Sequence, residues 1–174
     1  MHLLRGKVPI VHAFLACPLT PAQLDSVHTE FEFGSFARFS ATYHLFIHDE
    51  PQFHGKPHAD IRRDLDERGM TEAFLILDEK VGTDKAAWLV SHMVSQDDVD
   101  EKQAVSTEDV WEILTYIEQI PIVKVNYDVA NMSIQEDLCN CDVRWPYNPR
   151  RYPQEQIHSS GLDMKAYQTS KALI

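Results

Sequence analysis

The sequence predicts a single α+β domain, with a small mixed or antiparallel sheet of about five strands, about three helices and an extended C-terminal tail. Its 174 residues, 44% of them hydrophobic, have the length and composition of one ordinary domain with its own core. Short runs rich in β-branched and aromatic residues alternate with segments whose apolar residues recur at helical spacing. Near the C-terminus, Pro146, Pro149 and Pro153 disfavour regular structure. We therefore divide the chain into an α+β domain over 1–143 and a basic, proline-containing extension over 144–174.

The first half of the chain is expected to form two strands and two helices. These are a strand over 8–16, a helix over 21–31, a strand over 41–48 and a helix over 57–68. Both strands are rich in β-branched and aromatic residues, and the second alternates between two faces. Thr20 and Pro21 supply the N-cap and the first residue of the first helix, and Gly69 ends the second. The segment 33–39 contains a glycine and a serine, which indicates a turn or an irregular strand.

The second half is expected to contain three strands and one helix. These are strands over 73–77, 86–93 and 122–125, and a helix that begins at 106 and is broken by Pro121. The continuous apolar run 73–77 is typical of a strand covered on both faces. The helix prediction depends on Val110, Trp111, Leu114 and Ile117, which recur at helical spacing. Residues 78–84 indicate a turn, residues 95–102 an exposed acidic loop, and residues 126–138 a loop leading into a short helix.

Charge and cysteine content restrict the function classes. A formal net charge of −11 excludes nucleic-acid binding as the default, because neutralising phosphates needs a surplus of Lys and Arg on one face. No apolar run approaches the roughly 18 residues that a membrane helix needs. The three cysteines, Cys17, Cys139 and Cys141, make neither a disulfide framework nor a four-ligand zinc site. We expect a cytoplasmic protein without cofactor, nucleic-acid partner or membrane partner.

Histidine is concentrated in one stretch of the chain. Four of the nine histidines, His44, His48, His54 and His58, lie within fifteen residues. Imidazole titrates near neutral pH and is the commonest metal ligand. On a strand, His44 and His48 lie roughly 13 Å apart and cannot bind one ion, at about 3.3 Å per residue. His48, His54 and His58 could still converge through the loop between them, so a metal site stays open as an alternative to exposed loop histidines.

The alternation of the expected strands predicts a pocket lined by histidines and aromatic residues. We expect His12, His44, His48 and His92 as proton carriers, Asp78 as a residue that orients one of them, and Phe14, Phe46 and Trp88 as apolar walls. On each strand the histidines share a face with these aromatic residues. Burial would lower the pKa values of the histidines and leave neutral imidazoles that accept or donate a proton. The alternative is that each is a hydrogen-bonded histidine without a ligand.

Two further blocks carry a family resemblance. Residues 74–79 read Phe-Leu-Ile-Leu-Asp-Glu, and residues 125–134 contain Ala130-Asn131-Met132. Together they resemble a family of small microbial α+β domains of unknown function, over residues 70–138. Its members carry a similar strand and a near-terminal Asn-Leu-x-x-Ala-Asn-Met signature, from which this chain departs at Tyr127. The family has no assigned activity, so the resemblance implies no catalytic role; Asn131 is expected to bond local backbone or adopt the left-handed conformation, and Met132 to pack inward.

Two functions from different classes remain. The first is a cofactor-free acid–base enzyme of the isomerase, cyclase or lyase type, which acts on a small organic molecule in the histidine-lined pocket. The second is a non-enzymatic interaction or regulatory module that uses its acidic body and the arginine and aromatic residues of its tail. Those tail residues are Arg144, Trp145, Tyr147, Arg150, Arg151 and Tyr152, which are of the types enriched at interfaces. In either case we expect the chain to form a homo-oligomer.

Overall fold

A mixed five-stranded sheet forms the centre of the computed structural model, which describes residues 8–38, 43–141, 143 and 145–150. The strands are β1 (Ile10–Leu15), β2 (His44–His48), β3 (Phe74–Leu77), β4 (Ala86–Met93) and β5 (Val110–Tyr116), in the order β2-β1-β3-β4-β5. β1 pairs in parallel with both β2 and β3, whereas β3, β4 and β5 are antiparallel. This arrangement confirms the expected α+β fold.

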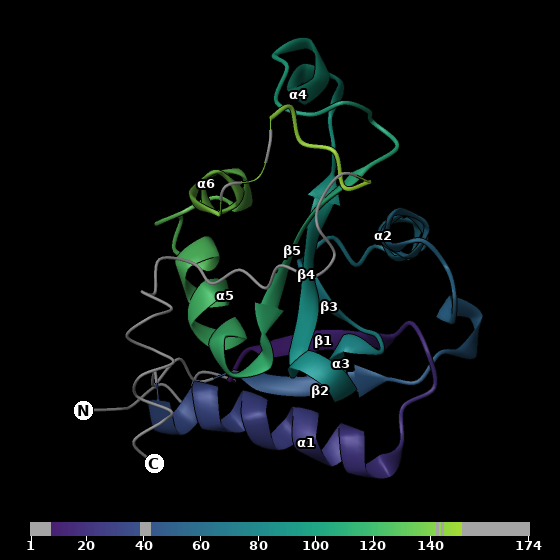
Figure 1. Cartoon of the computed structure of the whole chain (residues 1–174), viewed down its shortest axis with the longest axis vertical. Coiled ribbons are helices and arrows are strands. Elements are labelled where there is room, and N and C mark those ends of the chain that lie inside the picture. Colours follow the sequence, from purple (N-terminus) through teal and green to yellow (C-terminus); the bar gives the residue numbers. More distant parts are fainter. Residues whose placement is uncertain (1–7, 39–42, 142, 144, 151–174) are drawn as a thin grey trace.

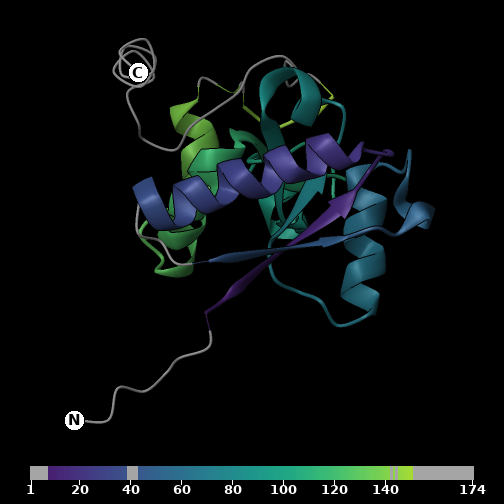
Figure 2. The same ribbon diagram turned by 90° about the horizontal axis from the view of Figure 1, so that it is seen from below.

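Helices cover both faces of this sheet. The α-helices of the described residues are α1 (Pro21–Glu32), α2 (His58–Glu67), α3 (Lys80–Asp84), α4 (Gln96–Asp100), α5 (Ile120–Asp128) and α6 (Ile134–Asn140), of which α4 lies beyond the end of the sheet. A π-helix, Phe33–Arg38, continues α1, and short 3-10 turns lie at Pro51–Phe53 and Ile117–Gln119. Figure 1 shows α2 on one side of β4 and β5, with α5 and α6 on the other. Seen from below in Figure 2, α1 lies across the sheet.

Strand register determines which side chains lie beneath α2. Phe14 pairs with Ile76, and Ile76 with Trp88, so these three share one face of the sheet. The same alternation puts Glu112 of β5 on that face, because it pairs with Val90. We call this the α2 face. Residues of the opposite face, such as Leu75, are fully buried beneath the other helices.

The buried side chain of Arg62 fixes α2 to this face. Its Nη1 donates to the carbonyl oxygens of Glu72 at 2.8 Å and Ser91 at 3.1 Å, and its Nη2 donates to the carbonyl of Met70. The guanidinium also pairs with Asp66 at 2.7 Å and lies 4.8 Å from the centre of the Phe74 ring. One cation therefore joins α2 to β4 and to the segment before β3.

Two predicted elements in the second half are wrong. The expected helix from 106 is in fact strand β5 followed by a 3-10 turn, and the expected strand 122–125 lies within α5. Residues 110–115 are all buried, because helices cover both faces of β5. A run that is apolar on every side does not distinguish strand from helix. Pro121 occupies the first turn of α5, where its missing N–H is tolerated, and therefore begins a helix instead of breaking one.

Three shorter segments also differ from expectation. Residues 33–38 are helical and not a turn, and a Cβ on Gly34 would lie 1.9 Å from the carbonyl oxygen of Glu118, so only glycine fits there. The expected turn at 78–84 contains α3. The expected acidic loop contains α4, which Ser95 and Asp98 begin with a capping box.

The first described residues of the proposed C-terminal extension pack on the body. Tyr147 is fully buried, its ring stacks on Trp111 at 4.7 Å between centroids, and its backbone bonds to Gln103 and Val105. The remainder of the extension, from residue 151, lies outside the described residues. Among the helices that the structure describes, none is long and apolar enough to cross a membrane.

Candidate functional site

A pocket of about 750 Å³ lies at the carboxyl ends of β1 and β3. Its walls include Ala16, which follows β1, Asp78, which follows β3, and Trp88 of β4. His58 at the start of α2 and Glu112 of β5 also line it. In parallel sheets, ligand sites commonly form at this end of the strands.

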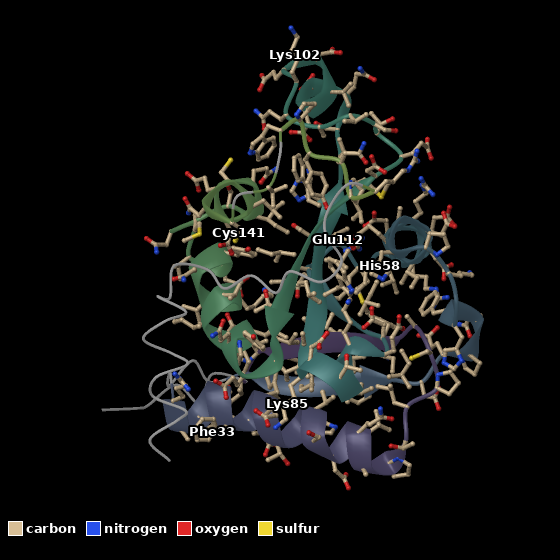
Figure 3. All side chains as sticks on the ribbon, in the orientation of Figure 1. Phe33, His58, Lys85, Lys102, Glu112 and Cys141 are labelled. Carbon is tan, nitrogen blue, oxygen red and sulfur yellow. The ribbon has the colours of Figure 1, made fainter. Side chains whose placement is uncertain are left out.

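His58 and Glu112 form a close pair in this pocket. The Nδ1 atom of His58 lies 2.5 Å from Oε2 of Glu112, and Figure 3 shows the two residues side by side between α2 and β5. The side chains are 20% and 10% exposed, so the pair is largely shielded while His58 still reaches the pocket. Within the described part of the chain, Nε2 of His58 has no hydrogen-bond partner. One ring nitrogen is thus fixed and the other is left for a ligand.

The surroundings raise the pKa of His58. Burial by itself lowers this pKa, but the charge and hydrogen bond of the Glu112 carboxylate, together with other nearby carboxylates, outweigh burial. The charges of Asp78 and Glu79 act in the same direction. His58 therefore keeps its proton to a higher pH than a free imidazole does, and in the protonated form Nε2–H is a donor.

A second polar contact fixes the wall of the pocket. Nε1 of Trp88 donates to Oδ2 of Asp78 at 3.0 Å, and the backbone N–H of Lys80 donates to Oδ1 at 2.9 Å. The Trp88 ring lies edge-on to the His58 ring, with 5.5 Å between centroids. Asp78 and Trp88 thus hold each other and restrict the orientation of His58.

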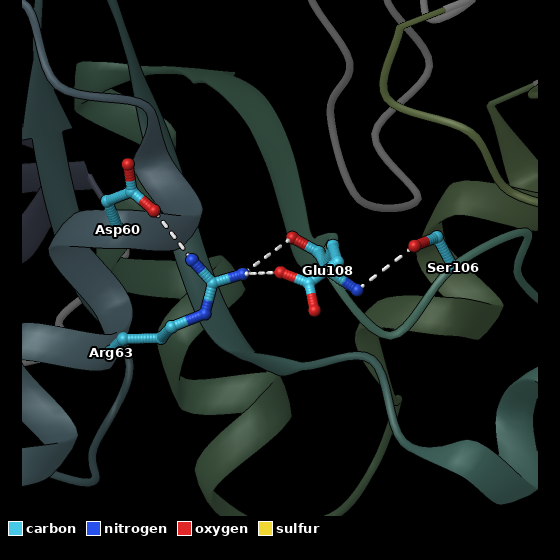
Figure 4. Close-up of polar contacts among 4 residues, drawn as sticks. All are labelled: Asp60, Arg63, Ser106 and Glu108. Carbon is cyan, nitrogen blue, oxygen red and sulfur yellow. Dashed lines mark hydrogen bonds and ion pairs between the residues drawn. The ribbon is translucent and has the colours of Figure 1, made fainter.

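The rim of the pocket joins α2 to the segment before β5. Arg63 contacts Asp60 at 2.6 Å and the carboxylate of Glu108 at 2.5 Å, and the backbone N–H of Glu108 donates to Ser106 Oγ at 3.1 Å (Figure 4). Asp60, Arg63 and Glu108 all line the pocket. These contacts hold the N-terminal half of α2, and with it His58, near β5.

Asp109 is a second titratable group in the pocket. Burial raises its pKa, and although Arg150 lowers it, the neighbouring carboxylates of Glu112 and Glu108 raise it further. A carboxyl group whose pKa is raised becomes a better base near neutral pH. The pocket therefore contains a histidine, His58, and a carboxyl group, Asp109, whose pKa values are both raised.

Two of the expected proton carriers meet elsewhere on the α2 face. His12 Nδ1 lies 2.9 Å from His48 Nε2, on the neighbouring strands β1 and β2. Phe14 stacks on His48 at 4.5 Å between centroids, and Phe46 lies 4.7 Å from the same ring. Burial and the neighbouring His12 lower the pKa of His48, while Glu50 partly opposes them.

His44 and His92 lie apart from that group. His44 begins β2, and the centroid of its ring lies 5.5 Å from that of Phe36 in the π-helix. His92 is exposed near the end of β4, where its Nδ1 lies 2.9 Å from Ser91 Oγ. Of the residues expected from the sequence, Asp78 and Trp88 are the two that line the pocket around His58.

The sequence reasoning missed the pairing of His58 with Glu112. The histidine spacing indicates a metal ligand or an exposed loop histidine at His58, and Glu112 falls within the helix expected from 106. A single glutamate within the apolar run of β5 was the available signal, because a buried carboxylate needs a partner.

The described residues contain no group of three His, Cys, Asp or Glu side chains placed to hold a metal ion. His48 contacts His12, His54 lies 3.9 Å from Asp49, and His58 contacts Glu112. The three histidines considered for a metal site thus have separate neighbours.

Comparison with protein-family models, curated proteins and solved structures finds no match to this chain. The resemblance over residues 70–138 therefore stays a prediction. The left-handed conformation, one of two expectations for Asn131, is adopted by Ala130, whose φ is 53°. The N–H groups of Ala130 and Asn131 bond to the carbonyls of Tyr127 and Asn126, which ends α5 in a Schellman motif.

Proposed function

We propose that this protein is a cofactor-free acid–base enzyme, of the isomerase, cyclase or lyase type, that acts on a small organic molecule in the pocket around His58. The observation that carries the proposal is the His58–Glu112 contact of 2.5 Å inside a pocket of about 750 Å³. Pockets of roughly 300–1,000 Å³ are typical for small ligands.

His58 is the proposed proton donor. Glu112 holds Nδ1, which fixes the ring orientation and supports the protonated form. Nε2–H would then deliver its proton to an oxygen or carbon atom of the substrate. Glu112 acts through His58 and is a positioning residue.

Asp109 is the proposed base. It lines the same pocket, and its raised pKa makes the carboxylate more able to accept a proton. One group that donates and one that accepts are sufficient for a reaction that moves a proton from one position of a molecule to another.

A thiol nucleophile receives no support from the charges near the pocket. Burial raises the pKa of Cys17, which directly follows Ala16, and the charges of Glu79 and Asp78 raise it further. A thiol in such surroundings stays protonated and weakly nucleophilic. Cys17, Cys139 and Cys141 are all free, which supports a proposed cytoplasmic location.

Deuterium incorporation from D2O tests this function without knowing the substrate. The protein is incubated in D2O with a panel of small hydroxy, keto and amino acids, and carbon-bound deuterium is measured by NMR. We expect at least one compound to exchange with the wild type and to lose about 10²-fold or more in rate with His58→Asn. Exchange that persists in His58→Asn contradicts the proposed role of His58.

The interaction module is a second candidate, because Trp145 is 38% exposed at a groove of about 670 Å³. Met132 and Cys139 line the same groove. Since Tyr147 belongs to the core, the informative truncation removes residues 151–174 and leaves residues 145–150 in place. Loss of a binding partner or oligomer with an intact fold would favour this candidate, and unchanged assembly would count against it.

A further inference from the structure

The outer edge of β2 carries backbone groups that no other strand of the described residues pairs with. β2 is the first strand in the sheet order, so β1 lies on one side of it and no described strand on the other. The N–H of His44 donates to the carbonyl of Pro9 at 3.0 Å, so the backbone groups of His44 point toward β1. By alternation along the strand, those of Leu45 and Ile47 point to the open edge.

This edge lacks the usual protection against pairing. β2 reads His-Leu-Phe-Ile-His, with no lysine, carboxylate or proline. Phe46 is 52% exposed, and Ile10, paired with His44 in the neighbouring strand, is 48% exposed. Free edges are commonly blocked by charged residues, prolines or bulges, and an apolar edge without them invites another strand.

The strand is also nearly symmetrical about its centre. On either side of Phe46 lie Leu45 and Ile47, and beyond them His44 and His48. A two-fold axis at Phe46 would therefore place like residues opposite each other in an antiparallel pair. We propose that two copies of this chain associate through their β2 edges, with Phe46 facing Phe46 of the second copy.

Backbone geometry agrees with this register. With the axis at Phe46, Leu45 of each copy lies opposite Ile47 of the other. These are the residues whose N–H and C=O groups point outward, so each such pair exchanges two hydrogen bonds, as antiparallel strands require. Phe46 then forms the non-hydrogen-bonded pair between them, where side chains are closest.

The open edge of β2 ends at Tyr43, which limits the length of the proposed strand pairing. One residue before β2, the Tyr43 N–H donates to Ser35 Oγ at 2.7 Å, and Ser35 Oγ donates to the Tyr43 carbonyl at 2.9 Å. Tyr43 is thus already satisfied, and the open edge is restricted to β2 itself. A strand of the same length from a second copy fits this opening.

Charge favours this surface over others for self-association. The chain has a formal net charge of −11, so two copies repel each other wherever carboxylates face. β2 contains no Asp, Glu, Lys or Arg, so the proposed contact is uncharged while its histidines are neutral. An interface of this length belongs to the small class, and we expect a weak, concentration-dependent dimer.

Cysteine cross-linking tests the register directly. Cα atoms of a non-hydrogen-bonded pair lie about 4.5 Å apart, within the span of a disulfide. The test uses the full chain with Cys17, Cys139 and Cys141 replaced by Ser, mild oxidation, and non-reducing gels. Phe46→Cys should form a covalent dimer. Val129→Cys, at an even more exposed apolar residue directly after α5, should stay monomeric.

Sedimentation of the wild type and Phe46→Lys over a range of concentrations provides the second test. Two lysines opposed at the axis should raise the dimer dissociation constant by about tenfold or more, with Val129→Lys as the control and circular dichroism as the check on folding. A wild type that stays monomeric at all concentrations, or a dimer unaffected by Phe46→Lys, would overturn the proposal. Equal cross-linking of Phe46→Cys and Val129→Cys would also overturn it.

Discussion

His58 and Glu112 are 54 residues apart in the chain, yet Nδ1 of the first lies 2.5 Å from Oε2 of the second. The start of α2 brings the imidazole to the sheet, and the central position of Glu112 on β5 brings the carboxylate to meet it. Among the described residues, Glu112 is the only charged partner at hydrogen-bond distance from the largely buried His58 imidazole. It decides both the protonation of His58 and the placement of its free nitrogen.

The His58–Glu112 pair should make stability depend on pH. Because the pKa of His58 is raised in the folded state, the pair stabilises the fold fully below the unfolded pKa of about 6.5. This contribution is lost as pH rises through the folded pKa. Glu112→Gln should remove it, at a loss of about 1.5–3 kcal/mol at pH 6. Urea unfolding at pH 6 and pH 9 measures the effect, and an equal loss at both values would contradict it.

Arg62 should be essential for stability. Arg62→Met leaves three backbone carbonyls without their donor inside the protein, and we expect a loss of about 3–5 kcal/mol in unfolding free energy. Arg63→Met is the matched control on the same helix, since Arg63 is half-exposed and should contribute less than about 1 kcal/mol. Thermal and urea unfolding of both variants make the comparison. Similar losses for the two would refute the assigned role of Arg62.

Ala130→Gly should stabilise the protein. Ala130 has a φ of 53°, a conformation that is unfavourable for a residue with a Cβ and natural for glycine. After allowing for the greater freedom of glycine in the unfolded chain, we expect a gain of about 0.5–1 kcal/mol. Ala22→Gly, at an exposed site in α1, should instead destabilise by about the same amount. A loss of stability with Ala130→Gly would contradict the structure of this turn.

The sequence was a good guide where local signals are strong. The capping box at Thr20 begins α1, and the apolar run 74–77 is a fully buried strand. It misled at β5 and α5, because helices on both faces of β5 remove the alternation by which a strand is recognised. The secondary structure of that segment depends on tertiary packing, which the sequence pattern does not reveal.

The candidate site was predictable only in part. Asp78 and Trp88 were expected to line a pocket with other histidines, and they line the pocket around His58. The expected shared face also exists, because Phe14, Ile76 and Trp88 pair across the sheet. Which histidine would join Trp88 depended on how α2 docks, and no pattern within a single segment determines that long-range arrangement.

The most direct measurement is an NMR titration of the histidine side chains in the wild type and in Glu112→Gln, with His58→Asn used to assign the His58 signal. The structure predicts that His58 titrates above the unperturbed value of about 6.5 in the wild type and falls when Glu112 loses its charge. A His58 that titrates at or below about 6.5, with no response to Glu112→Gln, would contradict its role as the proton donor.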